Sequence, residues 1–274
     1  MREGAVSKHV TRFFMYAFLV IVSFISVFPL YWAFISAFNS TQQILGGRMI
    51  PSVYLMQNLQ NLFAQQDVWN AMKNSFATSI LQTVLALAVS SIAGYGFEIY
   101  HDKHKDGLMS ILMLAMMVPF VAVLVPLFQF FSKLKLLNTW VGFFLPGLAT
   151  PFLIMYFRNS ARTFPKDTIE AARIDGLNEF QIFVKMFVPM MKPTYAAAAT
   201  MTFMNAWNAY LWPKVVMQTN ASQTMPMLVA NITTGYVTDY GMLMAGVTLC
   251  SLPTVIVFFL LQKHFTNAVA GAVK

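Results

Sequence analysis

The sequence predicts an all-α integral membrane protein with six transmembrane helices, both termini in the cytoplasm and one transmembrane domain over residues 1–274. Three observations support this prediction. The chain is 58% hydrophobic and only 10% charged, whereas soluble domains carry about 25% charged residues. Six stretches approach or exceed the roughly 20 apolar residues that a helix needs to cross a bilayer. Thirteen of the eighteen Lys and Arg residues flank these stretches on one side, which is the bias expected of cytoplasmic segments.

The six predicted spans share a complete lack of Asp, Glu, Lys, Arg and His residues. They cover residues 13–38, 74–97, 108–131, 140–157, 194–212 and 242–261. The first is longer than the apolar region of a cleaved signal peptide, so we expect it to remain as a span. Pro119 and Pro126 predict a kink in the third span, and Pro146 and Pro151 predict one in the fourth.

A short amphipathic helix is predicted in the loop between the first two spans. Leu55, Leu59, Leu62 and Phe63 recur there at helical spacing. We expect this helix to lie on the outer surface, either as a docking site for a partner or as an interfacial helix without one.

The uncharged spans restrict the kind of transport that the chain can carry out. Proton-coupled carriers and ion pumps use charged residues within the membrane, and none lies in these spans. The sequence also has no P-loop, Gly-x-x-x-x-Gly-Lys-Ser/Thr, so ATP hydrolysis by that route needs another subunit. The basic residues lie in short loops between apolar runs, which argues against nucleic acid as a partner.

A neutral, hydroxyl-rich substrate fits spans that offer amides and aromatic rings instead of charges. Asn205, Trp207, Asn208 and Tyr210 in the fifth span are candidate pathway residues for such a substrate. Polar residues in spans also serve helix–helix packing, so both interpretations stay open for each of them.

The longest polar segment between two spans, residues 162–192, predicts a helix, a sharp turn and a second helix. Pro165 to Asp175 forms the first helix, because proline is favoured in a first turn. Gly176 follows at the position of a left-handed C-terminal cap. Asn178 begins the second helix with a capping box, and Pro189 and Pro193 are expected to end it.

The first of these helices offers a surface for another protein. Ala171 and Ala172 are expected to leave a shallow face that a partner backbone can approach closely, and Glu170 places a charge at its edge. The alternative is a surface hairpin that only links two spans.

Two sets of residues carry a resemblance to a known family. The pattern Glu170-Ala171-Ala172, three residues, Gly176 and then Pro189, placed between the fourth and fifth of six spans, resembles the coupling loop of permease subunits of bacterial ATP-binding-cassette importers. The sequence Trp207-Asn208-Ala209-Tyr210 followed by Pro213, and the ending Ala270 to Lys274, resemble the carbohydrate-uptake branch, which includes the smaller permease of the maltose importer.

The resemblance implies a type I importer permease fold in a bacterial cytoplasmic membrane. It implies a heterodimer with a second permease, an ATPase dimer that binds ATP and Mg, an extracytoplasmic solute-binding protein and a sugar substrate. This chain would hold no cofactor or metal of its own and would carry no catalytic residue. The resemblance assigns coupling to Glu170, Ala171, Ala172, Asp175, Gly176 and Pro189. It assigns contact with the ATPase to the tail 263–274, in particular Ala270, Gly271, Ala272, Val273 and Lys274.

Other functions remain possible at the level of sequence. The same machinery could import glycerol phosphate or an amino acid, and a stand-alone carrier or a membrane enzyme is a more distant alternative. An enzyme would need clustered polar side chains at the membrane surface. One such cluster exists, and we interpret it as a solvated cytoplasmic loop; it consists of His101, Asp102, Lys103, His104 and Asp106.

Overall fold

The computed structural model describes residues 3–233 and 238–272, with side chains over residues 12–233 and 238–262. These residues form helices joined by turns, and no strand occurs among them, as the all-α prediction requires. The chain divides into two compact units. The first comprises residues 1–66 and 229–251, and the second comprises residues 67–228 and 252–274.

Helices of the first unit are held together by side-chain amides and one carboxylate. The unit contains α1 (Glu3–Ser36), α2 (Thr41–Leu45), α3 (Leu55–Gln65) and parts of α14 (Met225–Ile232) and α15 (Tyr240–Ala272). Asn58 of α3 donates hydrogen bonds to the carbonyls of Ala37 and Asn39, at 2.8 and 3.0 Å. Asp239 accepts from the Met242 amide at the start of α15 and from Thr41 of α2. The predicted amphipathic helix near Leu55 is thus confirmed as α3.

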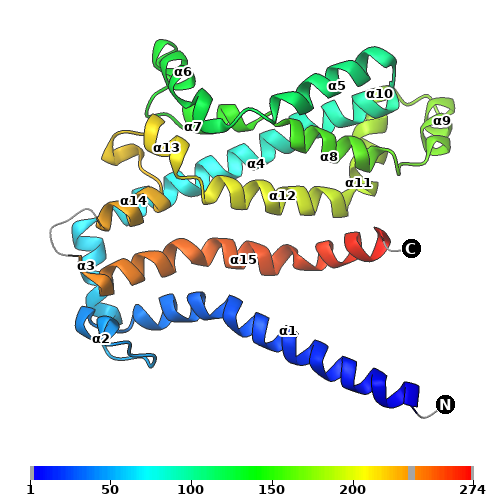
Figure 1. Ribbon diagram of the computed structural model, residues 1–274. Helices are drawn as coiled ribbons and strands as arrows, with labels where there is room; N and C mark the ends of the chain where they lie inside the picture. The colour runs from blue at the N-terminus through cyan, green and yellow to red at the C-terminus, as the bar shows by residue number, and fades with distance from the viewer. Residues whose placement is uncertain (1–2, 234–237, 273–274) are drawn as a thin grey trace. The chain divides into compact units, whose positions relative to one another are not determined.

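The second unit is built around three helices that pack side by side (Figure 1). These are α4 (Val68–Ile99), α8 (Pro151–Ala161) and α12 (Lys192–Trp207). Buried apolar side chains fill the space between them, namely Ala86, Leu87, Leu153, Phe157 and Ala198.

Glycine allows α4 and α8 to approach closely. A Cβ atom on Gly94 would lie 2.7 Å from Phe157 Cβ and 2.7 Å from the Arg158 backbone nitrogen. Real side chains do not tolerate such distances, so only glycine fits at this crossing.

The other helices that lie wholly within the second unit surround this core (Figure 1). They are α5 (Lys103–Ala115), α6 (Phe120–Lys133), α7 (Trp140–Phe144), η1 (Leu145–Gly147), α9 (Lys166–Ile174), α10 (Glu179–Ile182), the π-helical η2 (Phe183–Phe187), α11 (Val188–Met190), α13 (Leu211–Val216) and η3 (Asn220–Ser222).

Three predicted spans correspond to continuous helices that are long and apolar enough to cross a membrane. Within the described residues these are Arg12–Ser36, Val68–Ile99 and Tyr240–Gln262. The third and fourth predicted spans are bent pairs, as their prolines suggested. Lys103–Ala115 and Phe120–Lys133 meet at 97°, and Trp140–Gly147 and Pro151–Ala161 meet at 51°. Pro119 and Pro151 lie at the two bends, whereas Pro126 lies inside α6.

The fifth predicted span extends too far at its C-terminal end. Helix α12 ends at Trp207 rather than at residue 212, and a separate helix, α13, follows. The backbone N–H and the side-chain amide of Asn208 both donate to the Met204 carbonyl, at 3.0 and 2.9 Å, where the helix ends. Trp212 packs in a separate apolar cluster that includes Phe131 and Phe143. Its Nε1 donates to the carbonyls of Gly142 and Phe143 at 3.0 and 3.1 Å.

Candidate functional site

The polar segment between α8 and α12 forms the predicted helix, turn and helix. Helix α9 begins after Pro165 and ends before Asp175, and Gly176 has φ +82°, the left-handed region. Asn178 and Gln181 form the predicted capping box at the start of α10. The turn at Gly176 therefore depends on glycine for its conformation, because L-residues pay a penalty there.

The two prolines after this turn have a different role from the predicted one. Pro189 lies in the first turn of α11, and Pro193 lies in the first turn of α12. The chain stays helical through the π-helical η2 instead of ending at these prolines. Proline is tolerated at both places because the first helical turn needs no N–H from it.

One face of α9 is packed within this chain. Ile169 and Ala172 are buried, each 3% exposed, in a cluster that includes Tyr95, Ile182 and Phe187. The prediction that Ala172 lies on a face open to a partner is wrong for this reason. Ala172 is the third residue after Ile169, and that spacing places both on one side of a helix.

The opposite face of α9 and the turn are exposed. Glu170, Ala171, Asp175 and Gly176 are all exposed to solvent, so four of the predicted coupling residues lie on one continuous surface. Pro189 is exposed as well.

Two exposed apolar side chains on this surface were not predicted from the sequence. Ile174 is 86% exposed and Phe180 is 71% exposed, and they lie on either side of the Gly176 turn. Helical spacing could have found Ile174, because five positions from the buried Ile169 correspond to a rotation of about 140°. We name the exposed set Glu170, Ala171, Ile174, Asp175, Gly176 and Phe180 the α9 surface.

A polar cluster links α9 to α10 and to the end of α4. Arg173 Nε donates to Glu179 Oε1 at 2.8 Å, and the Tyr100 hydroxyl donates to Glu179 Oε2. The hydrogen bond from Arg173, and then that from Tyr100, hold the pKa of Glu179 below its usual range. Burial, and then the hydrogen bond and negative charge of Glu179, raise the pKa of Tyr100 to about 12. Glu179 is therefore ionised and Tyr100 protonated at neutral pH.

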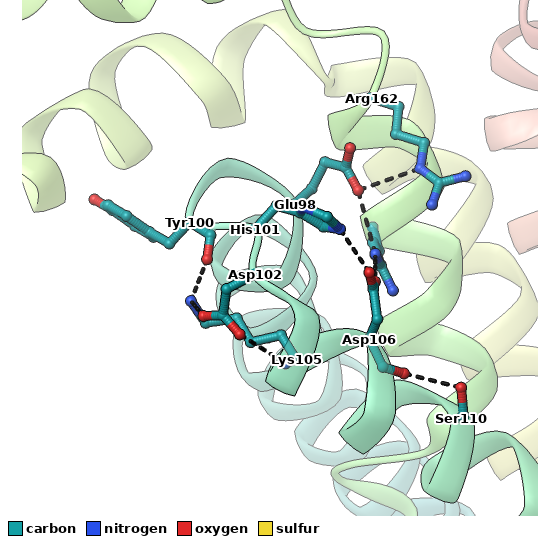
Figure 2. A network of polar contacts seen from close by, with 9 residues as sticks. Glu98, Tyr100, His101, Asp102, Lys105, Asp106, Ser110 and Arg162 are labelled. Atoms are coloured by element: carbon teal, nitrogen blue, oxygen red, sulfur yellow. Dashed lines mark hydrogen bonds and ion pairs between the residues drawn. The ribbon is translucent and has the colours of Figure 1, made fainter.

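A second polar network lies on the other side of the α4 end. Figure 2 shows Glu98, His101 and Asp106 gathered where α4 ends and α5 begins. The buried Arg158 of α8 donates to Glu98 at 3.2 Å and to Asp106 at 2.6 Å. Arg162 also donates to Glu98, at 3.2 Å. This network ties α4, α5 and α8 together by charge.

The polar loop after α4 is therefore more than a solvated link. His101 contacts Asp106 at 2.8 Å, and hydrogen bonds from Arg158 and then His101 keep the pKa of Asp106 low. Lys105 contacts Asp102 at 2.8 Å, and its side chain and backbone N–H lower the pKa of Asp102 to about 2. Among the described residues, no group of three or more His, Cys, Asp or Glu side chains could hold a metal.

The four candidate pathway residues do not share one environment. Trp207 is 1% exposed and packs edge-on against Phe76, with ring centroids 4.8 Å apart. Asn205, Asn208 and Tyr210 are exposed. Trp207 is thus part of the core between α4 and α12, whereas the other three lie on the surface of this chain.

The side chains of the predicted ATPase-contacting tail, residues 263–274, lie outside the part of the chain that the structure describes. Val273 and Lys274 are outside the described residues. The backbone of Ala270, Gly271 and Ala272 continues α15, and their side chains are outside the described part of the structure.

Comparison with known proteins gives consistent matches over most of the chain. A family model described as "Binding-protein-dependent transport system inner membrane component" matches residues 99–271. The lactose transport system permease protein LacG of Rhizobium radiobacter is 40% identical over 259 residues, covering 94% of this chain and 95% of the relative. The arabinooligosaccharides transport system permease protein AraQ of Halalkalibacterium halodurans is 35% identical over 259 residues, covering 92% and 93%.

A solved structure shares the fold. A chain from the crystal structure of a bacterial ABC transporter involved in the import of the acidic polysaccharide alginate aligns with a TM-score of 0.81 and 20% identity, over 94% of this chain and 98% of that chain. The fold of this chain is therefore that of an ABC importer permease. Together with the family match over residues 99–271, these findings show that the chain belongs to the family of binding-protein-dependent transport system inner membrane components.

Proposed function

We propose that this chain is the permease subunit of an ATP-driven, binding-protein-dependent carbohydrate importer in a bacterial cytoplasmic membrane. Two relatives with 40% and 35% identity are named for lactose and arabinooligosaccharide transport, which supports a sugar cargo. The uncharged spans agree with a neutral, hydroxyl-rich substrate.

The partners follow from the family. A second permease completes the pathway as a heterodimer, a separate ATPase dimer binds ATP and Mg, and an extracytoplasmic solute-binding protein delivers the sugar. Asn205, Asn208 and Tyr210 are the pathway residues that remain available, because Trp207 is buried.

The α9 surface is the observation that carries the coupling role. Helix α9 is anchored on one face by Ile169 and Ala172, yet Ile174 on the other face is 86% exposed to solvent. Phe180, 71% exposed, lies on the other side of the Gly176 turn, and exposed apolar side chains that gather on one surface are typical of a site that another protein covers. We therefore assign ATPase contact to Glu170, Ala171, Ile174, Asp175 and Gly176, with the tail 270–274 as a second contact.

In membrane topology, we propose six crossings within one transmembrane domain. They are α1, α4, the bent pair α5–α6, the bent pair α7–α8, α12 and α15, with both termini in the cytoplasm. The excess of Lys and Arg on the assigned cytoplasmic side supports this orientation. Cys250 is the sole cysteine, so single cysteines at Asp167 and Val53 in a Cys250→Ser background can be labelled from each side. Labelling of both from the same side contradicts the topology.

Co-purification tests the proposed assembly. The protein is extracted from its native membrane in mild detergent, and we expect an ATPase, a second permease and a solute-binding protein with it. The binding protein is then screened with lactose, arabinooligosaccharides, glycerol phosphate and amino acids. Binding of sugars supports the proposal, and binding of only glycerol phosphate or amino acids assigns a different cargo. Recovery of the chain alone contradicts the proposed machinery.

A pair of matched substitutions tests the coupling surface. Ile174→Asp is expected to abolish recovery of the ATPase, because it places a charge in an apolar contact. Val53→Asp is the control, since Val53 is 87% exposed and lies outside the α9 surface. Equal recovery of the ATPase with both variants contradicts the assignment.

A further inference from the structure

Glu179 is the meeting point of groups from three helices. It belongs to the first turn of α10 and accepts hydrogen bonds from Arg173 in the last turn of α9 and from Tyr100 at the end of α4. Tyr100 and Glu179 are 79 positions apart in the sequence, and the hydrogen bond between them joins the end of α4 to α10.

The apolar cluster around Ile169 and Ala172 packs α9 against Tyr95 of α4, and the hydrogen bonds of Glu179 add a directional connection to it. The turn between α9 and α10 contains Gly176, whose Cβ position meets nothing within 4 Å. Such a turn transmits displacement poorly, because glycine allows rotation at low cost. The hydrogen bonds to Glu179 are directional, and both involve an ionised group, which makes them stronger than neutral ones.

The end of α4 is held by further contacts. Tyr95 packs edge-on against Phe183 and Phe187, with ring centroids 5.3 and 4.9 Å apart. Glu98 is paired with Arg158 of α8 and with Arg162, the residue that follows α8. A displacement that reaches Tyr100 is therefore passed to α4 and α8 rather than dissipated in a loose loop.

We propose that Tyr100, Glu179 and Arg173 form a positioning clamp that transmits movement of the α9 surface to α4. The clamp rests on the proposed function, since it has a role only if an ATPase moves α9. The three residues position other elements and contact no substrate. Their side chains keep their charge states between about pH 6 and about pH 9, because the pKa of Glu179 is lowered and that of Tyr100 is raised.

Removal of one hydroxyl tests the clamp in the complete importer. The wild-type complex and Tyr100→Phe are placed in proteoliposomes, and sugar uptake per ATP hydrolysed is measured. We expect Tyr100→Phe to lower this ratio between about twofold and about thirtyfold, the range of coupling energies found for residues that contact no ligand. ATP hydrolysis, assembly and thermal stability of the complex are expected to stay close to wild type.

Tyr31→Phe is the matched control. Tyr31 is 44% exposed, Tyr100 is 41% exposed, and the Tyr31 hydroxyl also donates a hydrogen bond, to the Met49 carbonyl at 2.7 Å. Loss of this hydroxyl is expected to leave the ratio unchanged.

A double substitution separates a clamp from independent effects. Glu179→Gln is expected to lower the ratio as Tyr100→Phe does, and the two together are expected to be no worse than the more severe one, because they break the same connection. Arg173→Lys, which keeps the charge, is expected to recover part of the ratio lost in Arg173→Gln.

Two outcomes contradict the proposed clamp but leave the proposed function standing. The first is a wild-type ratio in Tyr100→Phe, and the second is a loss that disappears when uptake is normalised to assembled complex. The proposed function fails separately, when the wild-type complex imports no sugar on ATP hydrolysis.

Discussion

Replacing Gly176 tests whether the turn after α9 depends on backbone conformation alone in the isolated subunit. Gly176 has φ +82°, and a Cβ there would meet no heavy atom within 4 Å. The left-handed conformation costs an L-residue about 1–2 kcal/mol. Loss of freedom in the unfolded chain offsets about 0.4–1 kcal/mol of this. We therefore expect Gly176→Ala to lower the free energy of unfolding by roughly 1 kcal/mol, within a range of about 0–1.6 kcal/mol.

Side-chain size is expected to have little effect in the isolated subunit. Because the space around the Cβ is open, Gly176→Leu is expected to match Gly176→Ala within about 0.5 kcal/mol. Gly176→Asn is expected to be milder than both, since Asn visits this conformation more readily. The free energies are measured by denaturant unfolding of the purified subunit in detergent.

In the assembled importer, Gly176→Leu and Gly176→Ala are expected to differ in ATP-driven uptake. If an ATPase covers the α9 surface, the leucine side chain collides with it and ATP-driven uptake falls much further than in Gly176→Ala. Equal uptake by the two variants refutes a covered surface. A leucine variant that is less stable than the alanine variant by more than about 1 kcal/mol in the isolated subunit refutes the open space.

Three further substitutions test the packing around α4. Gly94→Val is expected to destabilise the subunit by at least about 1–3 kcal/mol, measured by unfolding in detergent, because its Cβ collides with α8; a neutral result rejects the close approach. Arg158→Met is expected to lower the free energy of unfolding by less than the roughly 3–5 kcal/mol of a broken, fully buried ion pair, because Glu98 and Asp106 are 21% and 47% exposed. Arg158→Lys is expected to lower it less than Arg158→Met does, and equal losses argue against the charge network. Trp207→Ala is expected to lower the free energy of unfolding by about 3–5 kcal/mol. Trp207→Phe is expected to fold normally and to retain sugar uptake. A Trp207→Phe variant that folds normally but takes up no sugar contradicts a purely structural role.

Local signals in the sequence were sufficient for most helices and for the turn at Gly176. Apolar length identified α1, α4 and α15 because lipid and core both select continuous apolar runs. The glycine at position 176 and the Asn178 capping box are formed by residues a few positions apart, so they needed no knowledge of the tertiary structure.

Features that depend on distant residues could not be predicted in this way. The burial of Ala172 is set by Tyr95, Ile182 and Phe187, which arrive from other helices. The hydrogen bond between Tyr100 and Glu179, and the ion pairs of Arg158, join residues 52 to 79 positions apart. Helix α12 ends at Trp207, and Trp212 packs in a separate cluster with Phe131 and Phe143, a contact between distant residues that hydrophobicity alone does not show.

The close approach at Gly94 restricts how this protein can change shape. Backbones in near contact cannot slide without collision, and the Arg158 ion pair with Glu98 resists rotation of α4 against α8 at the same point. The two helices therefore have to move as one rigid body, and any hinge that opens a path through the membrane has to lie outside their seam. Amino-acid changes along that seam would in turn be tolerated in matched pairs rather than singly.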